Sequence, residues 1–291
     1  MTNPTVALVT GASRGAGKGI ALALGEKSMT VYVTGRSEKT GEARGWDGSP
    51  LPGTIHDTAE AISKAGGTGI AVKCDHNNDG AVAELFDQIQ SDHGRLDILV
   101  NNAAYMHPQL IEDRPFWEKE IDAVGILDVG LRSAYIASWH AAKMMAAQRS
   151  GLITFTSSFG ATCYMHGPAY GAQKAGVDKL AHDMAVDLKP VGVNALSLWL
   201  GPQLTERALI AAEVNPEQYK DFIAMAETPQ FVGDIVHRLA SDPDTAELSG
   251  QTIITAEIAE KWGLRDRNGK QPPSHRKMLG DPRPPNPAII K

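Results

Sequence analysis

The feature that most constrains the fold is a regular alternation of short apolar runs with helical stretches along most of the chain. The apolar runs have the length and composition typical of buried parallel strands. They lie at residues 6–9, 30–34, 69–73, 96–100, 152–156, 193–198 and 251–254. Helical patterns separate them, for example at residues 18–26, 81–90, 134–149 and 172–188. Strands and helices in this order join through right-handed crossovers, so the sequence predicts an α/β fold: a single Rossmann-type, doubly wound parallel sheet of about seven strands with helices on both faces.

Two segments interrupt this alternation. Residues 37–55 form a connection rich in glycine and proline, and a connection of that length in a compact domain is either functional or mobile. Residues 266–291 are rich in proline, which favours an extended or disordered tail. We therefore predict one domain over residues 1–265, with a long loop at 37–55, followed by a Pro-rich C-terminal tail at 266–291.

The composition narrows the class of protein. The 291 residues carry a net charge of −6, with 42% hydrophobic and 21% charged residues, which is ordinary for a globular chain. The mild acidity argues against nucleic-acid binding. The 2 cysteines exclude a disulfide scaffold or a four-cysteine zinc site, and the histidines lack ligand spacing, so we expect no metal. Neither a signal-peptide pattern nor an apolar run of membrane length is found, which favours a cytoplasmic protein.

The segment TGASRGAG directly follows the first expected strand and leads into a helix. Gly11 allows a tight turn, Gly15 lets the backbone approach a pyrophosphate, and Gly17 permits close helix–strand packing. The helix N-terminus offers free N–H groups to phosphates, with Ser13 and Arg14 in the same turn. Three glycines alone often mark only a turn, but their position after a strand favours a dinucleotide-binding site.

The end of the second expected strand indicates which dinucleotide is bound. An acidic residue there would hold the ribose 2′-hydroxyl of NAD(H), but this chain has Gly35, Arg36 and Ser37 instead. An arginine removes the repulsion toward a 2′-phosphate and supplies a forked donor for it. The sequence therefore favours NADP(H) over NAD(H), although Arg36 could also be a solvated loop residue.

Tyr170 and Lys174 are four residues apart at the start of a predicted helix, so they share one face. A free phenol is a poor base at neutral pH, but a neighbouring ammonium stabilises the phenolate and lowers its pKa. Such a pair suits general acid–base catalysis, although the spacing alone is also common in surface helices. The preceding strand ends at Ser157 and Ser158, whose hydroxyls could bind a substrate carbonyl oxygen.

The order of these motifs resembles the short-chain dehydrogenase/reductase superfamily. The resemblance extends from residue 5 to about residue 260. Its segments are TGASRGAG, CD at Cys74, NNAA at Asn101, the serine pair, YGAQK at Tyr170 and GPQLT at Gly201.

The resemblance implies catalytic roles for three residues. Tyr170 would donate the proton, Lys174 would bind the nicotinamide ribose and lower the pKa of the phenol, and Ser158 would hold the substrate oxygen. Counting along the strand selects Ser158, whereas counting back from Tyr170 by the commonest family spacing selects Ser157. We prefer Ser158, because loops lose residues more easily than strands do.

The resemblance also implies cofactor contacts. Asp75 would bind the adenine, Asn102 would lie beside the adenosine ribose, and Thr205 would bind the carboxamide or the pyrophosphate.

Two departures from the family pattern stand out. The usual asparagine on the fourth helix is Gly130 here, so a water relay to the lysine would need backbone groups, waters or Asp128. The usual Pro-Gly after the sixth strand reads Gly-Pro, so the turn beside the nicotinamide can differ.

The implied activity is NADP(H)-dependent reduction of a carbonyl to an alcohol, or the reverse, on a small-molecule substrate. The family also implies a homodimer or homotetramer, formed through the helices at 134–149 and 172–188. The alternative is a non-catalytic NADP(H)-binding sensor or scaffold, which would have no need of the serine, tyrosine and lysine together. His107 and His166 could face a substrate, but we expect them on the surface.

Overall fold

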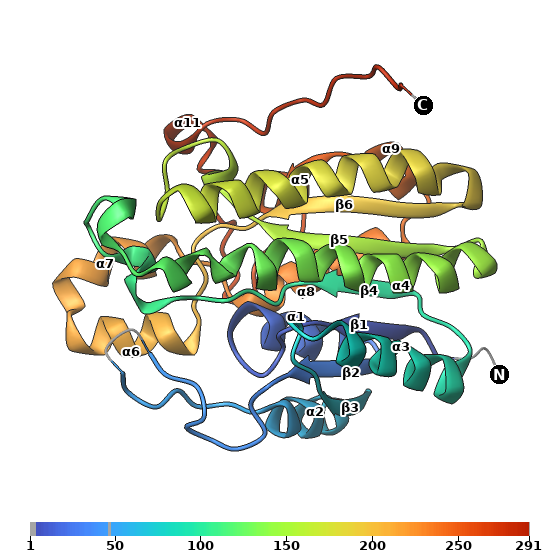
Figure 1. Cartoon of the computed structure of the whole chain (residues 1–291), viewed down its shortest axis with the longest axis horizontal. Helices are drawn as coiled ribbons and strands as arrows, with labels where there is room; N and C mark the ends of the chain where they lie inside the picture. Colours follow the sequence, from blue (N-terminus) through green and yellow to red (C-terminus); the bar gives the residue numbers. More distant parts are fainter. Residues whose placement is uncertain (1–3, 46–47, 291) are drawn as a thin grey trace.

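A seven-stranded parallel sheet forms the centre of the protein, in a computed structural model that describes residues 4–45 and 48–290 (Figure 1). The strand order is β3-β2-β1-β4-β5-β6-β7, and every neighbouring pair is parallel. The strands are β1 Val6–Val9, β2 Thr30–Gly35, β3 Thr68–Lys73, β4 Ile98–Asn101, β5 Gly151–Ser157, β6 Val193–Trp199 and β7 Thr252–Ile254. The predicted doubly wound fold is confirmed.

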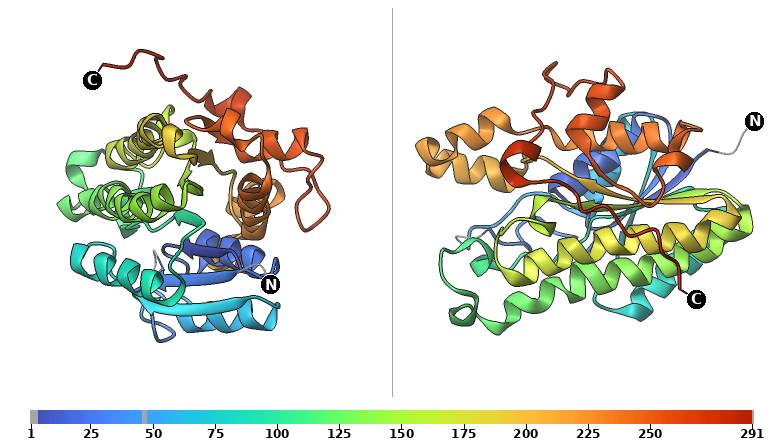
Figure 2. Two further views of the ribbon diagram at one scale, coloured as in Figure 1. Left: turned by 90° about the vertical axis from the view of Figure 1, so that its right-hand side faces the viewer. Right: turned by 90° about the horizontal axis from the view of Figure 1, so that it is seen from above.

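Helices cover both faces of this sheet (Figure 2). One apolar core lies between the sheet and α1, α2, α8 and α10, and a second lies between the sheet and α3, α4 and α5. The helices are α1 Gly15–Gly25, α2 Ile55–Lys64, α3 Asp79–His93, α4 Ser133–Gln148, α5 Pro168–Leu188, α6 Glu206–Val214, α7 Pro216–Met225, α8 Pro229–Ser241, α9 Thr245–Leu248, α10 Thr255–Lys261 and α11 Arg276–Leu279. Within the described part of the chain, no helix is long and apolar enough to cross a membrane.

The strand order reverses beside β1. This strand pairs with β2 on one side and with β4 on the other. The strands that follow β1 therefore extend the sheet first toward β3 on one side and then toward β7 on the other. In open α/β sheets, ligands bind outside the carboxyl ends of the strands at such a switch point. The glycine-rich turn follows β1 at this point, and β5 and β6 end at the same edge of the sheet.

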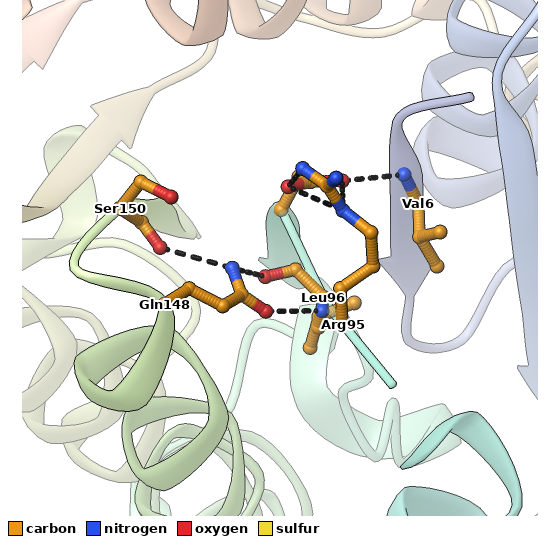
Figure 3. A network of polar contacts seen from close by, with 6 residues as sticks. Val6, Arg95, Leu96, Gln148 and Ser150 are labelled. Atoms are coloured by element: carbon orange, nitrogen blue, oxygen red, sulfur yellow. Dashed lines mark hydrogen bonds and ion pairs between the residues drawn. The ribbon is translucent and has the colours of Figure 1, made fainter. Parts of the chain in front are cut away.

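Side chains hold the strands in register at the opposite edge (Figure 3). Asp97 accepts a hydrogen bond from the Val6 backbone N–H at 2.8 Å and is held by the Arg95 guanidinium. The Gln148 side chain binds both the N–H and the C=O of Leu96. The backbone of Leu96 is thus bound by a side chain, and β4 begins two residues later than its apolar run predicts.

The first half of the C-terminal tail packs on the domain. Asp266 accepts a hydrogen bond from the Thr228 backbone N–H at 2.9 Å, and Arg276 pairs with Glu257. Leu279 of α11 packs against an apolar cluster that includes Phe159 and Trp199 at the ends of β5 and β6. The expectation of an extended or disordered segment is therefore wrong for residues 266–281, whose polar anchors a proline count does not reveal. Residues 282–290 form an extended, mostly exposed segment without secondary structure (Figure 2).

Candidate active site

The glycine-rich turn has the close packing that its residues predict. Gly11 has a φ of +65°, and a Cβ there would lie 2.8 Å from Ala103 Cα. A Cβ on Gly17 would lie 2.4 Å from Asn102 Nδ2. Side chains are therefore excluded at both positions, and the backbone of the turn can approach a ligand closely.

Asn102 holds this turn against β1. Its side-chain amide donates to the carbonyls of Thr10 and Gly11 at 2.9 and 3.1 Å, and its backbone N–H donates to Thr10 Oγ1 at 2.9 Å. The structure thus brings Asn102 to the predicted cofactor site with its amide nitrogen bonded to the turn. Its role beside the adenosine ribose stays a prediction.

The predicted adenine end lies at the ends of β2 and β3. Arg36 is exposed directly after β2, and Asp75 is exposed after β3, where its carboxylate accepts a hydrogen bond from the Asn77 N–H. Ser13 is buried, and its Oγ lies 3.7 Å from the position of a Cβ on Gly35. Three predicted residues, on the turn and on both strand ends, therefore border one side of the switch point.

Arg14 attaches the long loop to the turn. Its guanidinium donates to the carbonyls of Pro52 and Gly53 at 3.0 and 2.6 Å, and burial lowers the pKa of Arg14. Leu51 of the same loop is buried. The described parts of loop 37–55 are therefore bound beside the predicted cofactor site, whereas residues 46 and 47 lie outside the described residues.

The hydroxyl of Ser158 and the phenol of Tyr170 meet at the end of β5. Their oxygens are 2.9 Å apart. Ser158 also accepts a hydrogen bond from the Gly160 N–H at the first turn after the strand, which orients it. Helix α5 begins at Pro168, so Tyr170 lies in its first turn and faces this edge of the sheet. Ser157 is buried and donates instead to the Lys174 backbone carbonyl at 3.3 Å. The geometry thus brings Ser158, and not Ser157, to the phenol.

Lys174 lies one helical turn after Tyr170. Its Nζ donates to the Thr156 carbonyl at 3.2 Å and lies 5.3 Å from the centre of the Tyr170 ring. Burial lowers the pKa of Lys174 to about 8, although the Asp178 carboxylate opposes this shift. The ammonium therefore loses its proton far more readily than that of a solvated lysine.

Burial also dominates the titration of the phenol. It raises the pKa of Tyr170 above its ordinary value, and the hydrogen bond from Ser158 opposes the shift only in part. The spacing of Tyr170 and Lys174 predicts a lowered pKa for the phenol, but burial is the largest effect here and the pKa is raised. The phenol is thus protonated at neutral pH and can donate its proton.

Gly130 forms a kink where α4 begins. Its φ is +148°, its N–H donates to Ser133 Oγ, and its carbonyl accepts a hydrogen bond from the buried Gln173 side chain at 2.8 Å. Asp128 is exposed. Gln173 immediately precedes Lys174 on α5. Its side chain therefore binds the backbone carbonyl at the position where the family pattern has an asparagine.

The two histidines near the motifs differ: His166 is exposed, as expected, whereas His107 is buried. His107 is only 6% exposed, accepts a hydrogen bond from the Gln109 N–H, and faces Glu120, so the surface expectation is wrong for it. His166 has a φ of +58°, and its ring packs edge-on against Tyr170 with centroids 5.0 Å apart. His166 therefore borders the reactive phenol.

The residue after Thr205 is one that the sequence patterns do not single out. Thr205 begins α6 as its N-cap and accepts a hydrogen bond from the Ala208 N–H. The next residue, Glu206, accepts from the Gly15 N–H at 2.8 Å and pairs with Lys18 at 3.1 Å. An acidic residue in a first helical turn usually signals only helix capping, so the sequence alone does not reveal this contact with the glycine-rich turn.

The altered turn after β6 is tied to a buried carboxyl group. Glu227 is 1% exposed and accepts a hydrogen bond from Gln203 Nε2 at 2.5 Å. Burial raises the pKa of Glu227 to about 8, against hydrogen bonds from Gln203 and from the Gly201 backbone. The segment from Gly201 to Thr205 is thus anchored at one end by Glu227 and at the other by the first turn of α6.

Comparison with known proteins finds relatives over most of the chain. The family described as short chain dehydrogenase matches residues 5–213. The chain is 37% identical over 280 residues to human dehydrogenase/reductase SDR family member 1, covering 92% of this chain and 85% of that protein. It is 32% identical over 252 residues to a 3-oxoacyl-[acyl-carrier-protein] reductase from Synechocystis, covering 85% and 94%.

Solved structures agree with the fold. A crystal structure from Sinorhizobium meliloti 1021, assigned as a short-chain alcohol dehydrogenase, superposes with a TM-score of 0.70 at 25% identity, covering 86% of this chain and 94% of that one. One from Agrobacterium tumefaciens, assigned as a gluconate dehydrogenase, has a TM-score of 0.72 at 24% identity and covers 87% and 94%.

Proposed function

Because this chain belongs to the short-chain dehydrogenase/reductase family, we propose that it is an NADP(H)-dependent oxidoreductase that reduces a ketone or aldehyde to an alcohol, or runs the reverse reaction. The observation that carries the proposal is the 2.9 Å contact between Ser158 and Tyr170, one helical turn from the buried ammonium of Lys174. A protein that only bound the dinucleotide would not need these three groups together.

The residues of the chain would act on the oxygen of the substrate. Ser158 and Tyr170 are two hydroxyl donors that can converge on one carbonyl oxygen, where negative charge develops during reduction. Tyr170 then gives up its proton to that oxygen, and in the reverse direction the phenolate takes the proton back. The Lys174 ammonium stabilises the phenolate and is placed to bind the ribose. The bound nicotinamide supplies the hydride that these groups cannot provide.

The residues at the switch point fit a dinucleotide. The tight approaches at Gly11 and Gly17 keep the turn itself free of side chains, so that its backbone can come close to a pyrophosphate. Arg36 is exposed at the end of β2, and no described residue pairs with its guanidinium, so it is available to a 2′-phosphate. The first feature suits either dinucleotide, and Arg36 supports NADP(H) over NAD(H).

The proposed protein partners are further copies of the chain. Helices α4 and α5 lie side by side on one face, and α4 exposes Tyr135 and Trp139, each 48% accessible. These features support a homodimer or homotetramer formed through the two helices.

The test is an assay of the purified protein with NADPH and a panel of aldehydes and ketones. We expect carbonyl-dependent oxidation of NADPH, with the matching alcohol identified by mass spectrometry. Tight NADPH binding with no turnover of any carbonyl or alcohol would instead support a non-catalytic sensor or scaffold and contradict the proposal.

A further inference from the structure

The N-termini of α1 and α6 face each other across the glycine-rich turn. The two helices are far apart in the sequence, yet a Cβ on Gly15 would lie 3.5 Å from Thr205 Cγ2. The Glu206 carboxylate fills the space between them. One of its oxygens accepts the Gly15 N–H at 2.8 Å, and the other pairs with Lys18 Nζ at 3.1 Å.

This carboxylate is ionised and its surroundings are positive. Burial opposes the charge, but hydrogen bonds from the backbone of Glu206 and Gly15, together with Lys18, lower the pKa of Glu206. The guanidinium of Arg14 is close enough to interact with it electrostatically. Arg207, the next residue of α6, adds a second guanidinium near Arg14.

These donors are also those that a phosphate group would use. A helix N-terminus with a free N–H group and a nearby ammonium binds phosphate oxygens well. Here the same donors already hold an anion that belongs to the chain. A dinucleotide whose pyrophosphate approaches this N-terminus must therefore displace the carboxylate.

We propose that Glu206 is a tethered competitor for the pyrophosphate of the cofactor: its carboxylate occupies the phosphate-binding N-terminus of α1, and cofactor binding displaces it. This inference rests on the proposed function, because it assumes that a dinucleotide binds at the turn. It adds a gate to that function, because the first turn of α6 must shift before a pyrophosphate can take the place of the carboxylate.

The packing of α6 and α7 permits such a movement. Ala208 is the single buried residue of α6, and α7 has none. A segment with so few buried contacts opens at low cost in free energy. The Glu227–Gln203 bond holds the segment just before α6, so this turn is the natural hinge.

The experiment compares the wild-type protein with Glu206→Gln and with a control, Glu213→Gln, which removes the same charge from an exposed position on α6. Calorimetry measures the Kd of NADPH and of 2′-AMP, which carries the adenine-end phosphate but no pyrophosphate. A neutral amide competes less well for an N–H and an ammonium, so Glu206→Gln should bind NADPH roughly ten-fold more tightly. Its Kd for 2′-AMP should not change, and Glu213→Gln should behave as wild type with both ligands.

Equal or weaker NADPH binding by Glu206→Gln would overturn the competitor role, as would a gain shared with 2′-AMP or with the control. If neither protein binds NADPH, the proposed function itself fails and this inference falls with it. Should Glu206→Gln not fold, Glu206→Asp retains the charge but shortens the reach toward Gly15. It should also bind NADPH more tightly than wild type, and unchanged or weaker binding would contradict the inference.

Discussion

The hydroxyl oxygen of Ser158 lies 2.9 Å from the phenol oxygen of Tyr170, although the two residues come from a strand end and from the following helix. The turn after β5 and the start of α5 at Pro168 bring them together. Ser157, the adjacent residue, is bonded to the backbone of α5 instead. Two neighbouring hydroxyls therefore have different partners, and substitutions can separate their roles.

Replacing Ser158 with alanine should lower kcat by about 10²–10³-fold, because one donor to the developing oxyanion is lost. Replacing Ser157 with alanine should instead lower the free energy of unfolding by about 1 kcal/mol, since it removes a buried hydrogen bond. Steady-state kinetics and urea unfolding of both variants check this. If Ser157→Ala lost more activity than Ser158→Ala, the choice of serine would be wrong.

The activity should fall as the pH rises through about 8, because the pKa of Lys174 in the folded protein is about 8 and the ammonium is lost above it. The pH profile of kcat/KM for NADPH measures this step, since it reports groups of the free enzyme. Asp178 raises the pKa of Lys174, so Asp178→Asn should move the midpoint to lower pH. A wild-type profile with no decline on the basic side would contradict this assignment.

Replacing Arg36 with aspartate should weaken NADPH binding by about 10–100-fold, because a charge-assisted contact to the 2′-phosphate becomes a repulsion. NADH binding should be kept or improved, since a carboxylate can accept from the ribose hydroxyls. Titration with both cofactors gives the ratio of the two Kd values. Arg283→Asp, an equal charge change in the exposed tail, serves as the control. An unchanged ratio in Arg36→Asp would remove the basis for NADP(H) preference.

Deleting residues 282–291 should leave the melting temperature unchanged, because this part of the tail is mostly exposed. Deleting residues 266–291 should lower it, because Leu279 would no longer cover the cluster of Phe159 and Trp199. Leu279 is partly buried, so its loss costs about 1 kcal/mol, less than that of a fully buried leucine, which is roughly 2–4 °C for a chain of this size. Thermal unfolding of the two truncations decides the matter, and equal melting temperatures would show that the packed half contributes nothing.

The parts that could be predicted from the sequence are those whose signal is local. The apolar runs predict the strands, and the glycines of the turn are needed because neighbouring backbone leaves no room for a Cβ at Gly11 or Gly17. Tyr170 and Lys174 share a helix face through their spacing alone. Ser158 follows directly from the end of β5.

The parts that could not be predicted depend on long-range contacts. Glu206 and Gly15 are 191 residues apart, and no pattern near either residue announces their hydrogen bond. The anchoring of residues 266–281 depends on the side chains of Asp234 on α8 and Glu257 on α10. The raised pKa of Tyr170 follows from burial, which residue spacing does not report.

The central claim is that the phenol of Tyr170 transfers the proton in a dinucleotide-dependent carbonyl reduction. The most direct measurement is the single-turnover rate of carbonyl reduction by Tyr170→Phe, taken together with its Kd for NADPH. We predict a loss of about 10²–10⁴-fold in the rate with the Kd unchanged, because the ring is retained and only the proton donor is removed. A rate close to that of the wild type would contradict the account.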